Sequence, residues 1–302
     1  VRVVLVIAIV AYLVWRIYGN RAALESLTLQ WDLLSLAGAL VSCILAYQCL
    51  LLGWVMLLRR AGYYEARYLG VYARIWWSSY LYRYIPGKIL LIVERARMGS
   101  NVGIPASAGA ALTIIETLLS ILAGSAVSLL AIAYYAAVDK TLVIGVLTLV
   151  VGFIFIFPWA YRVFCRVPFI NEKYPELKTV ALRTQDVLIV VLPYIFYYLL
   201  LGVSFFLITK NLQLFGWSDL AGLCGIYALS HVISLVALLA PAGLGVREGA
   251  FAVQLGRLVP PGVSELLAIG ARVWFTIVEL LCYFCVALFC PALPTENRTD
   301  RT

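Results

Sequence analysis

The chain has 302 residues, of which 64% are hydrophobic and only 13% charged. One water-soluble core cannot hide this much apolar surface, so the composition excludes an ordinary soluble domain and requires lipid around part of the chain. The net charge is +8, from 23 basic and 15 acidic residues, but the basic residues lie mainly in short loops, as in the positive-inside pattern of membrane proteins. We therefore expect no nucleic-acid partner.

Seven apolar runs are long enough to cross a bilayer, for which about twenty residues are needed. In chain order they are Val1–Tyr18, Leu33–Leu58, Ser107–Val138, Leu142–Phe164, Val187–Thr209, Leu220–Ala240 and Glu265–Phe289. The first run lacks a small-residue cleavage site, so we expect a retained helix and not a signal peptide.

Two further apolar stretches are interrupted. Leu69–Met98 is broken by a Pro-Gly pair, and Pro241–Pro260 is broken by a proline and two glycines. Each stretch is either a re-entrant hairpin or a discontinuous crossing. We predict an all-α polytopic membrane protein with about seven to eight spanning helices and two broken or re-entrant segments, near 69–98 and 241–260. Residues 1–290 form one transmembrane domain in this interpretation, and residues 291–302 form a polar C-terminal tail.

Loop charge predicts the orientation of the chain. Basic residues follow the second and the fourth apolar run, and both loops should be cytoplasmic if the first broken segment enters and leaves on the same side. These residues are Arg59, Arg60, Arg67 and Arg74 in one loop and Arg162, Arg166, Lys173, Lys178 and Arg183 in the other. The side on which the C-terminus lies stays open.

The two halves of the chain show a weak internal echo. In each half a Pro/Gly break with a cation precedes an apolar helix that carries a glutamate, Glu116 in the first half and Glu279 in the second. Paired Gly/Pro-interrupted segments are typical of transporters whose site lies at a repeat interface. Apolar helices share composition, so chance similarity is the alternative interpretation.

The first break is a candidate phosphate site. Proline denies the helix a backbone donor and glycine relaxes the backbone, so the helix stops or restarts at Pro86-Gly87. A restarted helix offers free N–H groups and a positive dipole end, and Arg83 and Lys88 flank that point. The competing interpretation is an interfacial turn whose arginines extend to lipid head groups.

The second break contains Gly243 and Gly245, followed by adjacent Arg247 and Glu248. Non-helical backbone at membrane depth persists only where protein or water satisfies its polar groups, which predicts a cavity here. Ionisable residues inside membrane segments are functional candidates by default. Neutralisation of partners on neighbouring helices is the alternative.

Charged residues near the two breaks include more cations than carboxylates. The cations are Arg83, Lys88, Arg95, Arg97, Arg247 and Arg272, and the carboxylates are Glu94, Glu116, Glu248 and Glu279. Glu116 and Glu279 are expected to pair with Arg247, Arg272 or Arg95. A positive excess in a cavity favours an anionic head group, whereas structural ion pairs that lock the helices together are the alternative.

Other chemistry-bearing residues favour structural roles. His231, the single histidine, is predicted to be a hydrogen-bonded core residue, and Cys282 and Cys285 two small apolar helix residues. The aromatic residues near the first break are predicted to form an interfacial belt: Trp76, Trp77, Tyr80, Tyr82 and Tyr84. No catalytic or metal-binding motif is present, so we expect no enzyme activity, no metal and no cofactor.

The motif around Arg83-Tyr-Ile-Pro-Gly-Lys, with Glu94, Arg97 and Glu116, and the motif Pro241-Ala-Gly-Leu-Gly-Val-Arg-Glu-Gly resemble the lysylphosphatidylglycerol synthase transmembrane region. This flippase-like domain occurs in bacterial aminoacyl-phosphatidylglycerol flippases and in stand-alone membrane proteins. The resemblance covers nearly the whole chain. It departs from the family at Ile89–Val93, which separate the Pro-Gly-basic step from Glu94. No soluble aminoacyl-transfer domain is present, so the resemblance does not imply synthase activity.

Residues and resemblance together predict a transporter of an anionic phosphate-containing lipid across the bacterial cytoplasmic membrane. The lipid is a phospholipid, an aminoacyl-phospholipid or a polyprenyl-phosphate-linked sugar. The predicted binding residues are Arg83, Pro86, Gly87, Lys88, Glu94, Arg97, Glu116, Gly243, Gly245, Arg247, Glu248, Arg272 and Glu279. The alternatives are a membrane-embedded transferase with a lipid-phosphate donor and a non-transporting subunit of an envelope-synthesis complex. A homo-oligomer or an envelope-biosynthesis partner is also possible.

Overall fold

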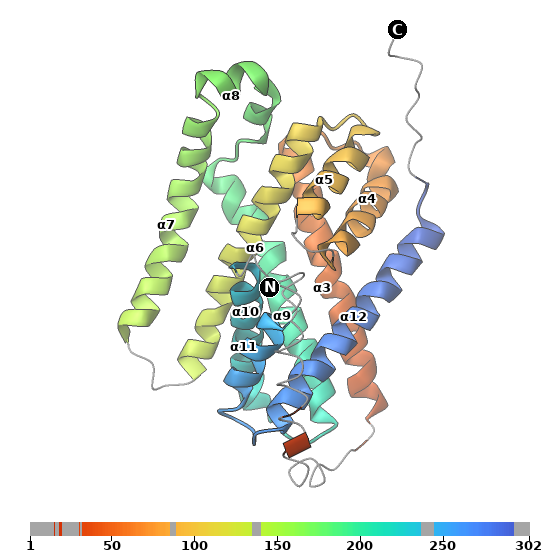
Figure 1. Cartoon of the computed structure of the whole chain (residues 1–302), viewed down its shortest axis with the longest axis vertical. Helices are drawn as coiled ribbons and strands as arrows, with labels where there is room; N and C mark the ends of the chain where they lie inside the picture. Colours follow the sequence, from red (N-terminus) through yellow and green to blue (C-terminus); the bar gives the residue numbers. More distant parts are fainter. Residues whose placement is uncertain are drawn as a thin grey trace.

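A computed structural model describes residues 15, 18–19, 30, 32–84, 89–134, 140–236 and 245–292. All regular elements in these ranges are helical (Figure 1). In chain order they are α3 (Leu33–Arg60), η1 (Ala66–Tyr68), α4 (Leu69–Leu81), η2 (Tyr82–Tyr84), α5 (Ile89–Ser100), α6 (Ala106–Tyr134), α7 (Lys140–Phe164), α8 (Pro168–Lys173), η3 (Pro175–Val180), α9 (Thr184–Lys210), η4 (Trp217–Asp219), α10 (Leu220–Val236), α11 (Val246–Leu255) and α12 (Val263–Phe289).

Five helical segments of the described chain are long and apolar enough to cross a membrane: α3, α6 as far as Ala131, α9, η4 with α10, and α12. The chain is therefore an all-α, multi-pass membrane protein, as predicted. The expected count of seven to eight spans goes beyond these five. The predicted span Leu142–Phe164 forms the helix α7, and the predicted span Val1–Tyr18 lies almost entirely outside the described residues.

Helix α3 begins where a side chain satisfies its free N–H groups. The Asp32 carboxylate accepts hydrogen bonds from the N–H groups of Leu34 (3.1 Å) and Ser35 (3.3 Å). The Ser35 hydroxyl also donates to this carboxylate, and these hydrogen bonds lower the pKa of Asp32 below its ordinary value. Asp32 N–H in turn donates to the Asn211 side chain (2.7 Å), which fixes the start of α3 beside the end of α9.

Glycines allow helices α6, α9 and α10 to approach closely. A Cβ atom on Gly124 of α6 would lie 2.5 Å from Val232 of α10 and 2.8 Å from the Tyr198 ring of α9. A Cβ atom on Gly225 of α10 would overlap the backbone of Ala131 in α6. Small residues at such positions are how membrane helices gain packing contacts without a hydrophobic driving force between them.

The helices fall into two halves with the same order of elements. In each half a long helix is followed by two shorter helices and then by a second long helix: α3, α4, α5 and α6 in the first, and α9, α10, α11 and α12 in the second. The halves run in opposite directions, because the end of α3 meets the start of α9 through Arg60 and Asp186 (2.9 Å). This repeated order of helices matches the similarity between the two halves of the sequence.

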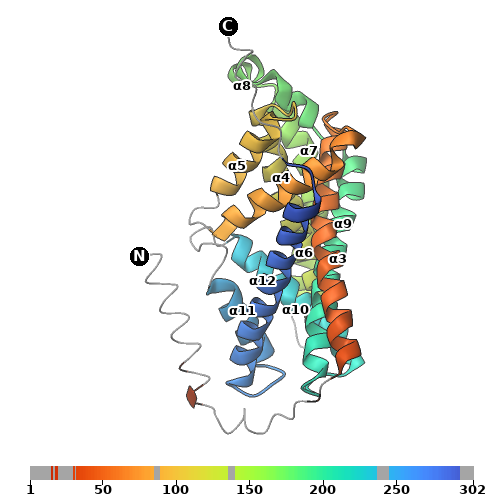
Figure 2. The same ribbon diagram turned by 90° about the vertical axis from the view of Figure 1, so that its right-hand side faces the viewer.

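Each pair of short helices forms a hairpin. Helices α4 and α5 lie side by side toward one end of the molecule, and α10 and α11 lie side by side toward the other end (Figures 1 and 2). The end of α4 and the start of α11 both lie near mid-height (Figure 2). The two helical hairpins therefore approach each other from opposite ends.

The two basic loops lie at the same end of the molecule. The Tyr63 and Thr179 hydroxyls, one from each loop, are 3.0 Å apart, and the Arg60–Asp186 ion pair lies beside them. The end of α12 is also at this end, because Arg74 of α4 donates to the Cys290 carbonyl (2.7 Å). The loops thus share one side, as the charge pattern predicts, and α12 ends on that side too.

Candidate functional site

A cavity of about 280 Å³ lies where the two hairpins meet. Both hairpins and the long helices α3, α6 and α9 contribute to its wall. The lining residues are Leu50, Tyr80, Arg83, Leu91, Ile92, Arg95, Ile114, Glu116, Thr117, Leu118, Ser120, Tyr197, His231, Ser234, Leu235 and Arg247. The wall therefore combines three arginines with an apolar side made of leucine and isoleucine.

The first arginine of the wall, Arg95 of α5, is fully neutralised. Its side chain is 1% exposed and forms an ion pair with Glu116 of α6. The Arg95 Nε group donates to the Ser79 hydroxyl (2.8 Å), and the Trp76 ring N–H donates to the second Glu116 oxygen (2.9 Å). Glu116 pairs with a partner that the sequence had suggested.

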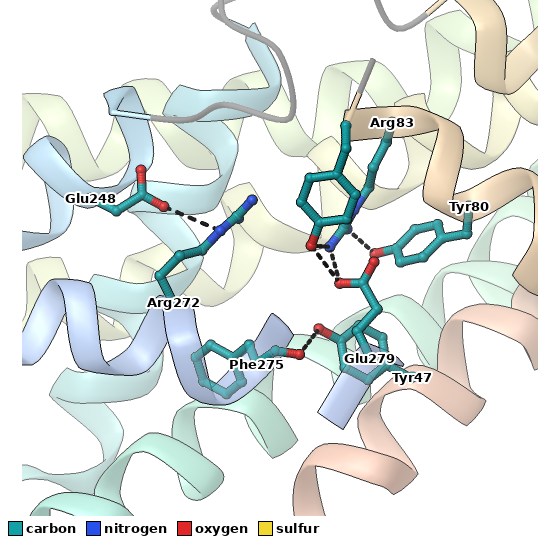
Figure 3. A network of polar contacts seen from close by, with 8 residues as sticks. Tyr47, Tyr80, Arg83, Glu248, Arg272, Phe275 and Glu279 are labelled. Carbon is teal, nitrogen blue, oxygen red and sulfur yellow. Dashed lines mark hydrogen bonds and ion pairs between the residues drawn. The ribbon is translucent and has the colours of Figure 1, made fainter. Parts of the chain in front are cut away.

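The second arginine, Arg83 of η2, crosses to the other half of the molecule. It forms an ion pair with Glu279 of α12, whose side chain is 1% exposed, and it also donates to the Tyr80 hydroxyl (Figure 3). The Tyr84 hydroxyl donates to the same Glu279 oxygen (3.1 Å). The sequence predicts Arg247, Arg272 or Arg95 as the partner of Glu279. That prediction is wrong, because the α4–α5 hairpin places Arg83 beside α12.

A third ion pair joins α11 and α12. Arg272 Nε lies 3.6 Å from a Glu248 oxygen (Figure 3), and the other Glu248 oxygen accepts the Gly245 N–H (2.7 Å). Gly245 precedes α11 with φ = 81°, a conformation that side chains other than glycine rarely adopt. The cation of Arg272 also lies over the Tyr84 ring, 5.5 Å from its centre. This glycine and this glutamate together set the direction of the first turn of α11.

Arg247 is the cavity arginine without a carboxylate partner. It is 8% exposed, and its cation lies over the rings of Tyr227 (4.7 Å) and Phe275 (5.8 Å). Across the described residues, no carboxylate lies within ion-pair distance of Arg247.

The central charges do not balance. Among the described residues, four buried or nearly buried cations (Arg83, Arg95, Arg247 and Arg272) face three carboxylates (Glu116, Glu248 and Glu279), which leaves 4 − 3 = +1. Burial of an unpaired charge costs on the order of several kcal/mol, because the ion loses its water. The arrangement suits an anion that enters the cavity and compensates Arg247.

The other predicted site residues are placed differently. Pro86, Gly87, Lys88 and Gly243 lie outside the described residues. Glu94 and Arg97 form an ion pair along α5 (2.7 Å), and the Arg97 side chain is 63% exposed. Neither residue lines the cavity, so the structure does not bring this pair to Arg247.

The predicted aromatic belt is wrong for three of its members. Trp76, Trp77 and Tyr80 are buried, and the Trp76 and Tyr80 rings stack with their centres 4.4 Å apart. Trp76, Tyr80 and Arg83 are spaced by four and three residues, so they share one face of a helix that meets polar partners. That spacing is the signal that sequence reasoning missed. His231 is buried against the Tyr197, Tyr198 and Tyr227 rings and reaches the cavity wall.

Comparison of the chain with protein-family models, with curated proteins and with solved structures finds no match. The resemblance to the flippase-like family therefore rests on the two sequence motifs, and the functional argument rests on the geometry of the cavity.

Proposed function

We propose that this chain moves an anionic, phosphate-bearing lipid between the leaflets of a membrane, without chemistry of its own. The observation that carries the proposal is Arg247, a buried arginine on a cavity wall that has no carboxylate of the described residues within ion-pair distance. Arginine binds phosphate through its planar fork of N–H donors. A phosphate group that reaches Arg247 would remove the positive excess of the cavity.

The outer wall of the cavity supports a lipid as the source of that phosphate. Ile114 of α6 lines the cavity and is also 47% exposed at the surface of an apolar helix, and Thr117 lines it one turn further along. A head group can therefore lie against the arginines while its acyl tails stay beside α6 in the bilayer. In this proposal Arg83, Arg95 and Arg272 are held by Glu279, Glu116 and Glu248 as the frame of the cavity.

The hairpins support movement across the bilayer. Two inverted halves whose helical hairpins approach each other near mid-height are the arrangement in which transporters place a site at the membrane midplane. In this proposal α4–α5 and α10–α11 are re-entrant hairpins, and the end with the two basic loops faces the cytoplasm. The motif resemblance agrees with a bacterial cytoplasmic membrane as the location.

Reconstitution tests this function. Liposomes containing the purified chain and a trace of fluorescent phosphatidylglycerol are treated with an impermeant quencher, and loss of fluorescence beyond the outer leaflet reports translocation. We expect Arg247→Gln to slow translocation by about tenfold or more, the cost of losing a charged hydrogen-bond donor to phosphate.

The matched control is Arg67→Gln. Arg67 lies outside the cavity with a 69% exposed side chain, so this variant loses the same charge without touching the cavity and should match the parent. Equal rates for Arg247→Gln and the parent would overturn the site. A parent chain that translocates no lipid would overturn the function, and turnover of a radiolabelled lipid-phosphate donor would then favour the transferase.

A further inference from the structure

The carboxylate oxygens of the described cavity wall already accept hydrogen bonds. Among the described lining residues the one carboxylate is Glu116, and both of its oxygens accept hydrogen bonds, one from Trp76 (2.9 Å) and one from Arg95. Glu279 and Glu248 do not line the cavity; their ion-pair partners are Arg83 and Arg272. Among the described lining residues, the wall therefore offers no free carboxylate to an incoming cation.

The donor side of the same wall is open. Arg247 contacts aromatic faces, which leaves its guanidinium N–H groups available to a ligand. Ser120 also lines the cavity, and its hydroxyl lies 3.1 Å from the Tyr198 hydroxyl, where either atom of the pair can donate. Hydroxyl groups of this kind bind a neutral polar group as donor or acceptor, but they do not compensate an ammonium charge.

The charge and the size of the cavity further restrict which ligands can bind there. The excess of one positive charge among the described central residues, which include the ion-pair partners behind the wall, is compensated by one phosphodiester. A volume of about 280 Å³ lies at the lower end of pockets for small molecules, which span roughly 300–1,000 Å³. That volume fits a phosphate with a small polar group.

From these observations we infer that the cavity accepts a singly charged lipid phosphodiester whose head group carries hydroxyls and no amine. This inference rests on the proposed function and specifies its substrate class. An ethanolamine or aminoacyl head group brings an ammonium beside Arg247 and Arg95, with no free carboxylate to receive it. The repulsion and the desolvation of that ammonium both weaken its binding.

Binding of short-chain lipids to the purified chain in detergent micelles tests the inference, with ligand-bound fractions measured by native mass spectrometry. The probes are dioctanoyl-phosphatidylglycerol, its ethanolamine counterpart, its lysyl ester and soluble glycerophosphoglycerol. We expect the glycerol lipid to bind about tenfold or more tightly than either amine lipid, and Arg247→Gln to abolish this preference. The soluble head group should bind more weakly than the lipid, because it lacks tails.

A second variant tests the cause of the preference. Arg95→Gln frees one Glu116 oxygen at the wall, so it should raise the binding of the amine lipids relative to the glycerol lipid. If Arg95→Gln does not fold, the parent ratio alone still decides. Equal binding of amine and glycerol lipids, with translocation intact, would overturn the inference but leave the proposed function. Binding of none of the lipids, or of the soluble head group as tightly as the lipid, would overturn the proposed function itself.

Discussion

Arg247 and Arg95 are both buried arginines of one cavity wall, yet their surroundings predict opposite effects on stability. Arg95 has Glu116 as its counter-charge, whereas the nearest contacts of Arg247 are two aromatic rings. Ring contacts with a cation contribute about 0.5–2 kcal/mol, which is less than the several kcal/mol that burial of an unpaired ion costs. Arg247 therefore destabilises the empty cavity, and this pattern is typical of a residue kept for binding.

Thermal unfolding in detergent separates these two roles. Glu116→Gln should lower the free energy of unfolding by about 3–5 kcal/mol, because Arg95 is then buried without its counter-charge. Arg247→Gln should leave the unfolding temperature unchanged or raise it. The exposed Arg67→Gln variant sets the scale of a small effect, below about 1 kcal/mol. A loss of stability in Arg247→Gln as large as that in Glu116→Gln would make Arg247 a structural residue.

The start of α11 shows how one glycine positions a charged pair. Gly245 has φ = 81° and ψ = −47°, and its N–H donates to Glu248 three residues later. Gly262 precedes α12 in the same way: its φ is 88°, and its N–H donates a hydrogen bond to the Glu265 carboxylate (2.6 Å). In both helices the glutamate satisfies a free N–H of the first turn and places a negative charge at the positive dipole end.

Gly245→Ala should therefore reduce both stability and lipid translocation. A Cβ atom disfavours this sparsely populated backbone conformation by about 1–3 kcal/mol, and relief of the strain would turn Arg247 and Glu248 away from the groups that they contact. Gly270→Ala is the matched control, because Gly270 lies inside α12 with nothing within 4 Å of an added Cβ. It should be neutral or stabilising by up to about 1 kcal/mol. Equal unfolding temperatures for both variants would contradict the role given to Gly245.

Across the whole molecule, the sequence predicts the long helices well and the pairing between halves poorly. Apolar runs of about twenty residues locate α3, α6, α9 and α12 within a few residues, because lipid demands that length. The Arg83–Glu279 pair joins positions 196 apart, and no local pattern distinguishes Arg83 from the other arginines as the partner. The predicted location of the α4 aromatic residues was wrong for a similar reason. An aromatic cluster beside a basic residue is also typical of a membrane interface, and the local sequence does not distinguish it from a buried cluster.

The Arg83–Glu279 pair joins the tip of one half to a long helix of the other, so it should hold the two halves together. Glu279→Gln leaves Arg83 without its counter-charge in a site where both side chains are nearly buried, 15% and 1% exposed. We expect the free energy of unfolding to fall by about 3–5 kcal/mol. The doubly exchanged variant, Arg83→Glu with Glu279→Arg, should recover part of that loss, which a double-mutant cycle measures as a coupling energy.

The exposed Arg67–Glu65 pair serves as the control, because its partners lie within one loop at 69% and 54% exposure. Glu65→Gln should change the free energy of unfolding by less than about 1 kcal/mol, since water compensates the charge that remains. A coupling energy for Arg83 and Glu279 no larger than that of this surface pair would show that the halves do not depend on the contact. The cohesion of the molecule would then rest on α3 against α9, where Tyr194 fills the space over Gly53.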